Sequence, residues 1–346
     1  MRAPEFWNIR SGREAAPALR TLLKPISWIY AWASARRIRT TKSYDAGIPV
    51  ICVGNVTMGG TGKTPVTAYL LNSLRRMGVN VVGLSRGYGG EEKGPIPVGR
   101  HHTAKNVGDE PLLLARNAPV WVSAGRDEGA RAAVSYGAEV IVMDDGHQNP
   151  SLQKTLSLIV VDAEVGFGNG CVFPAGPLRE RLAESLARAD AIILMKPEPS
   201  YEISKHLAFQ LKGKTIIPAY MKTPVKAPTG KLFAFAGIGR PNKFFDSLRR
   251  QGGELVEALS YNDHHPYNAQ DIKRLKSLSE EYDAQLITTE KDYIRLPKAF
   301  RRQVQVWPVM VQFEDELTLR SLLHPIIQTT GARIESHPDT KAADLH

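Results

Sequence analysis

Residues 54–65 read GNVTMGGTGKTP and have the residue types and spacing to bind a nucleoside triphosphate. They follow a short apolar, β-branched run at 48–53 and precede a segment with apolar residues at helical spacing. A glycine-rich turn between a strand and a helix directs backbone N–H groups and the positive end of the helix dipole at phosphates. We therefore expect Lys63 to contact the β- and γ-phosphates and the Thr64 hydroxyl to bind Mg²⁺.

This P-loop-like stretch departs from the usual pattern at one position. Strict spacing places the first glycine of G-x-x-x-x-G-K-[ST] at Thr57. The competing interpretation is a glycine-rich turn without function, but Gly-Lys-Thr at a strand–helix junction favours a phosphate site. The residues predicted to contact the nucleotide here are Thr57, Met58, Gly59, Gly60, Thr61, Gly62, Lys63 and Thr64.

Two adjacent carboxylates, Asp144 and Asp145, end a buried run that starts at residue 138. A strand-terminal Asp after a P-loop is the Walker-B arrangement, which holds Mg²⁺ directly or through water. If the strand continues, the two side chains point to opposite sides, and the sequence leaves open which one faces the metal. The alternative is a turn-forming Asp-Asp-Gly. We expect Thr64, Asp144 and Asp145 to form the Mg²⁺ site.

Asp109 and the polar run 263–266 (DHHP) are candidates for acid–base chemistry. Asp109 precedes Glu-Pro and an apolar run, as a helix N-cap does, but it also suits a general base near the phosphates. His264 or His265 could accept a hydroxyl proton, since histidine titrates near neutral pH. A metal site or a solvated turn are the alternatives for the two histidines. The pattern alone decides neither question.

Two further segments carry arginines where an anionic ligand could bind. Residues 86–90 (RGYGG) follow a second expected strand, and open α/β sheets bind ligands at that edge, which makes Arg86 a candidate substrate residue. Pro177 suits the first turn of a helix, and that turn would then contain Arg179 and Glu180. An Arg at a helix start opposes the dipole and so indicates an anionic partner. A flexible connection and a solvated Arg are the respective alternatives.

Net charge is +10 and is concentrated at the N-terminus. Residues 1–42 hold nine Arg or Lys against two Glu, which gives +7 and leaves +3 for the remainder, and they contain three of the five Trp. The longest uncharged run there, 25–35, is too short to cross a bilayer. No small-residue cleavage site follows an apolar run, which argues against a signal peptide. A basic, aromatic helix of this kind suits an anionic membrane surface, although packing on the domain or contact with nucleic acid would also explain it. The two cysteines form no ligand cluster and suggest a reducing, cytoplasmic setting.

Strands alternate with helices from residue 48 to about 215, which predicts a P-loop NTPase-like α/β fold with a doubly wound parallel sheet. A second, smaller α/β domain is expected to follow, joined by a two-stranded linker. The expected segments are 1–42, a basic amphipathic membrane-surface segment; 43–215, the core; 216–312, the second domain, with linker strands near 216–222 and 304–312; 313–331, a helix; and 332–346, a disordered tail.

Taken together, these motifs resemble the tetraacyldisaccharide 4'-kinase family, the lipid A 4'-kinases of Gram-negative bacteria. The segments that carry the resemblance are 53–65, 85–90, 108–111, 144–148, 176–180, 263–266 and 289–292. They occur in this order, and Thr57 in place of glycine is usual for the family's loop.

The resemblance implies transfer of the ATP γ-phosphate to the 4'-hydroxyl of a tetraacylated glucosamine disaccharide 1-phosphate, with Mg²⁺, at the cytoplasmic face of the inner membrane. It implies that Asp109 pairs with His264 to deprotonate the hydroxyl, and that Lys63 is catalytic. It places Arg179 and Glu180 on the nucleotide side. Asn55, Arg86 and Gln148 are its substrate residues.

Three rival classes remain. MinD-like or dethiobiotin-synthetase-like P-loop ATPases share the Gly-Gly-x-Gly-Lys-Thr loop, but the MinD-like loop carries Lys where this chain has Met58. A GTPase would need Asn-Lys-x-Asp, and 289–292 (TEKD) has the wrong spacing. A nucleic-acid-binding protein would need a basic stripe, and none is evident beyond 1–42. We therefore expect no nucleic-acid partner.

Overall fold

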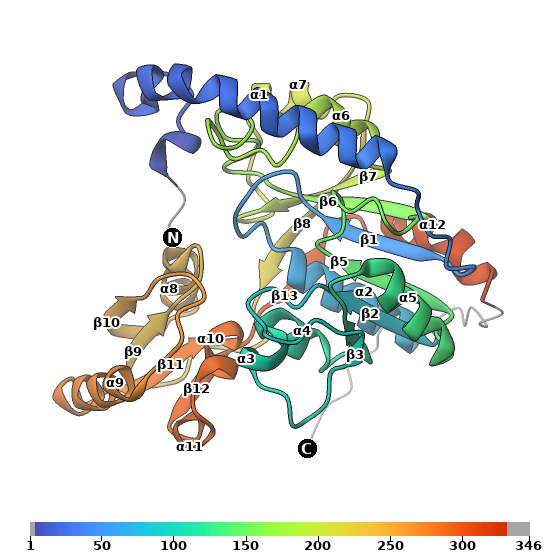
Figure 1. The fold of residues 1–346 in the computed structure, drawn as a ribbon. Coiled ribbons are helices and arrows are strands. Elements are labelled where there is room, and N and C mark those ends of the chain that lie inside the picture. The colour runs from blue at the N-terminus through green and yellow to red at the C-terminus, as the bar shows by residue number, and fades with distance from the viewer. Residues whose placement is uncertain (1–3, 331–346) are drawn as a thin grey trace.

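The computed structural model describes residues 4–330, which fold as two α/β units, each built on its own sheet (Figure 1). The helices are α1 Pro17–Thr40, α2 Lys63–Arg76, α3 Ala104–Val107, α4 Asp109–Leu114, α5 Arg126–Ser135, α6 Leu182–Ala187, α7 Lys205–Gln210, α8 Pro241–Arg250, α9 Ala269–Glu281, α10 Glu290–Arg295, α11 Lys298–Arg301 and α12 Glu316–Gln328. The strands are β1 Val50–Gly54, β2 Val81–Ser85, β3 Ile96–Pro97, β4 Val120–Val122, β5 Val140–Asp144, β6 Leu156–Asp162, β7 Ala191–Lys196, β8 Thr215–Lys222, β9 Lys231–Ala236, β10 Glu254–Ser260, β11 Gln285–Thr289, β12 Val304–Trp307 and β13 Met310–Phe313.

The larger sheet has the strand order β13-β8-β7-β6-β1-β5-β2-β4-β3. All its neighbouring pairs are parallel except those of the two edge strands, β13 and β3. Strands such as β1, β5 and β6 are buried along their whole length, because helices cover both faces. The apolar residues of α2, α4 and α12 pack on one face, and those of α5, α6 and α7 pack on the other. This doubly wound arrangement confirms the predicted fold class.

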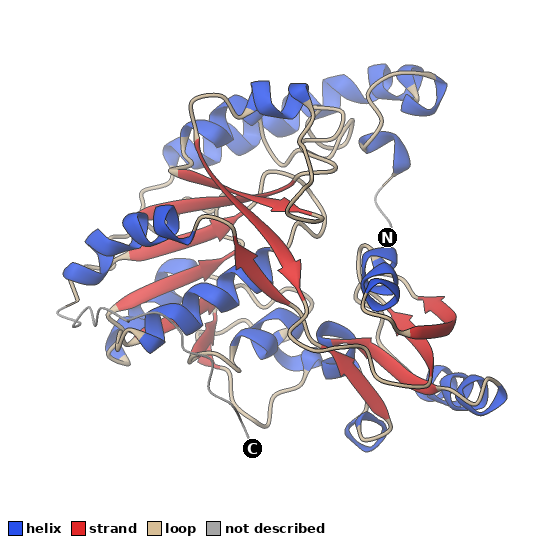
Figure 2. Cartoon of the chain, turned by 180° about the vertical axis from the view of Figure 1, so that it is seen from behind, coloured by secondary structure: helices blue, strands red, loops and turns tan. Residues whose placement is uncertain are grey.

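The smaller sheet, β10-β9-β11-β12, is parallel throughout. Phe244, Phe245 and Leu248 of α8 pack on one face, while Leu275 of α9 and Phe300 of α11 pack on the other. Figure 2 shows the two sheets lying apart, with extended chain running between them. The second unit is thus a small α/β domain with its own core.

The chain passes between the two sheets twice. It leaves the larger sheet after β8 and returns into β13, and these two strands pair antiparallel. The extended segment expected at 304–312 is divided: β12 belongs to the smaller sheet, and only β13 pairs with β8. The division falls at Pro308, which has no N–H to donate to a continuous ladder.

Helix α1 crosses the top of the larger domain in Figure 1 and turns an unusual face to it. The side chains that it buries are small, Ser27, Ala31 and Ala35, spaced four residues apart. Its large apolar side chains are exposed, including Leu22 and Trp28. No helix in the stretch 4–330 combines the length and apolar character needed to span a bilayer. The expected tail, 332–346, lies outside the described residues.

Candidate active site

The phosphate-binding loop lies between β1 and α2, at the carboxyl edge of the larger sheet. Gly62 adopts a left-handed backbone (φ 89°), which lets the chain turn into α2, so that Lys63 is the first helical residue. Gly59 and Gly60 are exposed, so their backbone is open to a ligand. These features place the predicted loop at the N-terminus of a 14-residue helix, where the helix dipole favours a bound phosphate.

Asn55 lies beneath this loop and is completely buried. Its Nδ2 donates to the Thr57 carbonyl at 2.7 Å, and it is 3.4 Å from both the Gly59 carbonyl and Thr61 Oγ1. A side chain enclosed in this way is not available to a lipid acceptor, so the predicted substrate role of Asn55 gives way to a structural one. It fixes the shape of the loop.

Residues 177–179 run beside the loop rather than forming the expected helix start, since α6 begins only at Leu182. Met58 N–H donates to the Pro177 carbonyl at 2.8 Å, and Arg179 N–H donates to the Val56 carbonyl at 2.8 Å. This pairing holds the backbone of 177–179 extended, which overrides the helix-favouring Pro. The Met58 N–H is therefore not free to bind a phosphate, and a contact of Met58 with the nucleotide would have to come from its other atoms.

Asp145 receives two cations at the mouth of the loop. Arg179 Nη1 lies 2.7 Å and Lys63 Nζ 3.6 Å from Asp145 Oδ1. Burial raises the pKa of Asp145, but the charges of Lys63 and Arg179 outweigh it and hold this pKa below its ordinary value. Asp144 points elsewhere: it is buried and accepts a hydrogen bond from Thr67 Oγ1 at 3.0 Å. The two carboxylates thus face different surroundings.

The surroundings of Asp144 suit a cation. Burial and the nearby carboxylates Glu110 and Asp145 raise the pKa of Asp144 to about 7. A bound divalent ion would relieve this concentration of negative charge. Within residues 4–330, no group of three or more His, Cys, Asp or Glu side chains is arranged to hold a metal. In nucleotide sites, Mg²⁺ keeps few protein ligands and fills its shell with phosphate and water oxygens.

Glu180 is buried and acts within the protein. Arg188 Nη2 donates to its Oε2 at 2.5 Å, and Gln148 Nε2 donates to its Oε1 at 3.0 Å. The same Gln148 nitrogen reaches the Asn55 carbonyl at 2.8 Å. Glu180 therefore orients Gln148 beside the loop instead of meeting the nucleotide as predicted. Arg86 is exposed just beyond β2.

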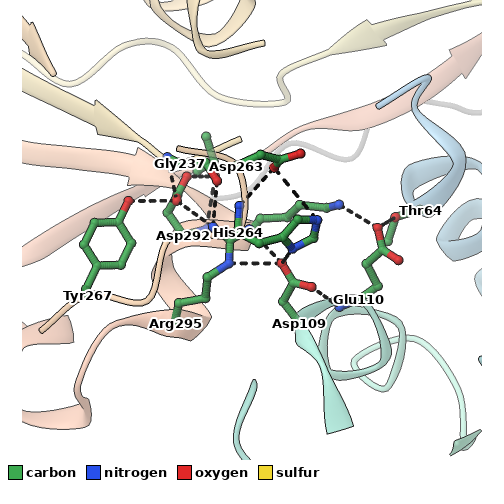
Figure 3. Close-up of polar contacts among 11 residues, drawn as sticks. Thr64, Asp109, Glu110, Gly237, Asp263, His264, Tyr267, Asp292 and Arg295 are labelled. Atoms are coloured by element: carbon green, nitrogen blue, oxygen red, sulfur yellow. Dashed lines mark hydrogen bonds and ion pairs between the residues drawn. The ribbon is translucent and has the colours of Figure 1, made fainter. Parts of the chain in front are cut away.

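Asp109 and His264 come together from the two domains, as Figure 3 shows. Asp109 is the first residue of α4, and its Oδ2 lies 3.1 Å from His264 Nδ1. The helix-capping alternative is wrong, because Gly108 occupies the N-cap position of α4 and the helix has no side-chain cap; Asp109 Oδ1 accepts from the adjacent Glu110 N–H at 3.0 Å. His265 points away, with Nε2 2.9 Å from Asp271 and its ring stacked on Tyr261. The geometry therefore favours His264 over His265.

The electrostatics of this pair are unequal. The hydrogen bond with Asp109 raises the pKa of His264, against the opposing effect of burial. Burial raises the pKa of Asp109, but the hydrogen bond with His264 and the charges of Lys291 and Arg295 hold it well below its usual range. Asp109 therefore stays ionised, and a proton that enters the pair resides on His264. His264 also has a left-handed backbone (φ 57°), a conformation found at functional sites.

Two neighbours of this pair, Glu110 and Lys291, were given no role from the sequence. Glu110 Oε1 lies 2.8 Å from Lys291 Nζ and 3.4 Å from Thr64 Oγ1, so it connects the second domain to the phosphate loop (Figure 3). Both residues fall inside segments that carried the resemblance, 108–111 and 289–292. Their place in those motifs was the only available signal, because spacing gave them no evident chemistry.

Comparison with known proteins decides the class. The chain matches the family model of LpxK, tetraacyldisaccharide-1-P 4'-kinase, over residues 19–328. It belongs to this family. The tetraacyldisaccharide 4'-kinase of Hyphomonas neptunium is 47% identical over 337 residues, which cover 96% of this chain and 99% of that protein. The Caulobacter vibrioides protein of the same name is 47% identical over 329 residues, covering 93% and 98%.

A solved structure of a tetraacyldisaccharide 4'-kinase family member agrees with the fold. The "apo" form of LpxK from Aquifex aeolicus, in complex with ATP, matches with a TM-score of 0.73 and 28% identity, covering 89% of this chain and 99% of that one. The resemblance found in the motifs is thus confirmed. Membership of a kinase family supports phosphoryl transfer from ATP over the MinD-like or dethiobiotin-synthetase-like ATPase alternative.

Proposed function

We propose that the protein is an ATP-dependent lipid kinase that phosphorylates the 4'-hydroxyl of a tetraacyldisaccharide 1-phosphate. The observation that carries this proposal is the Asp109–His264 pair, which is assembled across the domain boundary beside a phosphate-binding loop. A hydroxyl acceptor needs a base close to the γ-phosphate, and this pair supplies one. The relatives bear the name tetraacyldisaccharide 4'-kinase, and this name supplies the acceptor.

In this mechanism Asp109 orients His264 through Nδ1, which leaves Nε2 to accept the proton of the 4'-hydroxyl. The 4'-oxygen forms a bond to the γ-phosphorus, the bond from that phosphorus to the ADP oxygen breaks, and ADP leaves. Lys63 and the exposed glycines of the loop hold the phosphates in line for this transfer. Arg86 and Arg179 stand at the edge of the site, where anionic groups of either substrate would meet them.

The donor set also fits Mg²⁺. Thr64, Asp144 and Asp145 offer the hard oxygen ligands that this ion prefers, and Asp144 lies in a site whose negative charge favours a cation. When bound, the ion would neutralise charge on the β- and γ-phosphates. Among the protein's own residues, Lys63, whose Nζ lies 3.6 Å from Asp145 Oδ1, would add positive charge beside the same phosphates.

Helix α1 has the features of a helix that binds a membrane surface. It packs on the domain through small side chains and turns Leu22, Trp28 and Ile29 outward, while Arg36 and Arg37 lie near its end. Helices that combine exposed apolar and aromatic side chains with nearby cations bind anionic bilayers. An acylated acceptor stays in the bilayer, so a peripheral enzyme on the cytoplasmic face of the inner membrane would meet it there.

The test is transfer of ³²P from labelled ATP, with Mg²⁺, to tetraacyldisaccharide 1-phosphate in detergent micelles. We expect labelled lipid with the wild type and none with Lys63→Ala, because the lysine neutralises the transferred group. Arg181→Ala is the matched control, since Arg181 has an exposed side chain and its ion pair is the one with Glu184. ATP hydrolysis that depends on Lys63, without labelled lipid, would overturn the lipid-kinase proposal and favour the ATPase alternative.

A further inference from the structure

Arg295, the last residue of α10, is a buried guanidinium that contacts both domains. Its side chain is 5% exposed. Nε and Nη2 donate to Asp109 Oδ2 at 3.0 and 2.7 Å. Nη1 donates to the Gly237 carbonyl at 2.7 Å and to Asp292 Oδ1 at 3.1 Å. A charge this deeply buried is costly unless its partners are fixed. Figure 3 shows Asp109, Gly237 and Asp292 gathered around the Arg295 side chain.

The second domain holds Arg295 in a rigid frame. Asp292 is completely buried, and its Oδ1 also accepts from the Gly237 N–H at 2.8 Å and from the Tyr267 hydroxyl at 2.8 Å. Its Oδ2 is bonded to Thr289 Oγ1 at 2.6 Å. Each of these partners belongs to the second domain, so that domain holds the guanidinium through contacts that do not involve Asp109.

Asp109 Oδ2 consequently serves two groups from that domain. It accepts both Arg295 bonds and the hydrogen bond with His264 Nδ1. The planar guanidinium presents two fixed N–H groups to this one oxygen, a geometry that the rotating ammonium of a lysine does not reproduce. Together with the Glu110 N–H on Oδ1, these bonds hold both oxygens of the carboxylate beside the imidazole.

We infer that Arg295 is a positioning residue, which locks the Asp109 carboxylate against His264 when the second domain closes on the first. This inference rests on the proposed function, because the pair that it positions is the base of that reaction. Arg295 does not contact the acceptor. It sets the geometry of the pair and links that geometry to domain closure.

A neighbouring ion pair separates this role from simple adhesion between the domains. Arg116 Nη1 lies 3.4 Å from Glu290 Oε1, so it also joins the α4 region to α10, but its side chain is 46% exposed and it does not reach Asp109. Arg116→Met is therefore the matched control for Arg295→Met. Arg295→Lys keeps the charge but loses the fork, and it tests the geometry even if the Met variant folds poorly.

In the micelle assay we expect Arg295→Met to lower kcat at least about tenfold with little change in the KM for ATP. Arg295→Lys should recover part of this loss, and Arg116→Met should stay within about twofold of the wild type. Adding Arg295→Met to Asp109→Asn should cost nothing more, because the carboxylate that Arg295 orients is already gone. Wild-type kcat in Arg295→Met, or losses that multiply in the double variant, would overturn the inference.

A second readout does not depend on activity. The groups that face His264 are Asp109 from α4, Lys291 from α10, Asp263 from its own loop and the Tyr88 ring. If Arg295 holds Asp109 in place, the NMR-measured pKa of His264 in Arg295→Met falls toward its ordinary 6.5 as the hydrogen bond loosens. If Arg295 is only a nearby positive charge, its removal raises that pKa. A wild type that labels no lipid, together with a fall in this pKa, would sink the proposed function while leaving the positioning contact established.

Discussion

A hydrogen bond of 3.1 Å joins Asp109 to His264 across 155 residues of sequence, and each residue sits in a different domain. The bond is strongest when His264 is protonated, whereas a general base must be neutral. In the reaction proposed above, the Asp109 carboxylate would both orient the neutral imidazole and stabilise the imidazolium that forms as the hydroxyl loses its proton.

The pH dependence of the reaction follows from the raised pKa of His264. Because the protonated imidazole cannot accept a proton, we expect kcat/KM to fall as the pH drops through a value above the ordinary 6.5. His264→Ala should remove this limb and lower kcat by about 100- to 10,000-fold, with little change in ATP affinity. The checks are a pH–rate profile and equilibrium ATP binding. A selective loss of ATP affinity would contradict the assignment of His264 as base.

At this scale the sequence predicted the groups whose chemistry is local. Lys63 was found because a P-loop is contiguous, and Asp109 and His264 because each lies in a short motif. Arg295 was not predicted, because its partner Asp109 is 186 residues away and no spacing rule connects them. Glu180 was predicted to meet the nucleotide, but tertiary contacts bury it instead.

Among the elements, α1 reverses the usual pattern of a surface helix. Helices of globular proteins normally bury their large apolar side chains and expose polar ones. Here the large side chains are outside: Trp28 is 65% exposed and Ile29 is 67% exposed. Such a contiguous apolar face marks a binding surface for a protein or a membrane.

We expect Trp28→Ser with Ile29→Ser to weaken binding to vesicles that contain anionic phosphatidylglycerol by at least about tenfold. Each side chain is worth about 1.5–3 kcal/mol when it leaves water. Co-sedimentation measures the effect. Kinase activity on a water-soluble short-chain acceptor should be unaffected, because Trp28 and Ile29 lie on the exposed face, whereas the contact of α1 with the site is made by Arg37, which donates to the Gln148 carbonyl at 3.2 Å. Ala31→Ser, on the buried face, is the control, and equal vesicle binding by all variants would argue against this surface.

The central strands of the larger sheet, such as β1, β5 and β6, were predictable because burial on both faces gives continuous apolar runs. Strand β10 was not predicted: its sequence, ELVEALS, is half exposed at a sheet edge and carries two Glu. Helix α6 begins later than expected because residues 177–179 pair with the P-loop. Prediction from local propensity therefore failed where tertiary contacts determine the backbone conformation.

In the whole molecule, charged contacts join the two domains. Besides Asp109 and Glu110, Asp162 at the end of β6 accepts from Arg240 at 2.8 Å and from Lys243 at 3.0 Å. The sequence predicted two domains, but it could not predict how they meet, because these contacts have no local signature. The contacts between the domains include ion pairs with partly exposed cations, Arg240 and Lys243, which salt screens.

We expect Asp162→Asn to shift the molecule toward an open form, since it removes the ion pairs with both Arg240 and Lys243. Each such pair contributes up to about 1 kcal/mol, so the closed-to-open ratio should fall by up to about 30-fold. Small-angle scattering should show a larger radius of gyration for the variant, and the wild type should approach it as NaCl rises from about 50 mM to about 500 mM. Asp246→Asn is the control, because Asp246 pairs with Arg249 of its own helix. A radius that responds to neither change would show that other contacts hold the domains together.

The pairing of β8 with β13 makes the second domain an insertion in a hairpin. Lys222, the last residue of β8, lies opposite Met310, the first of β13. A tight turn of two residues could join these positions and leave every strand of the larger sheet in place. A single protease cut in residues 223–230 would not release the domain, because the chain still returns through Pro308 and Val309. A shortened chain of this kind would keep Lys63 and the nucleotide loop but have no His264, and so separate nucleotide capture from phosphoryl transfer.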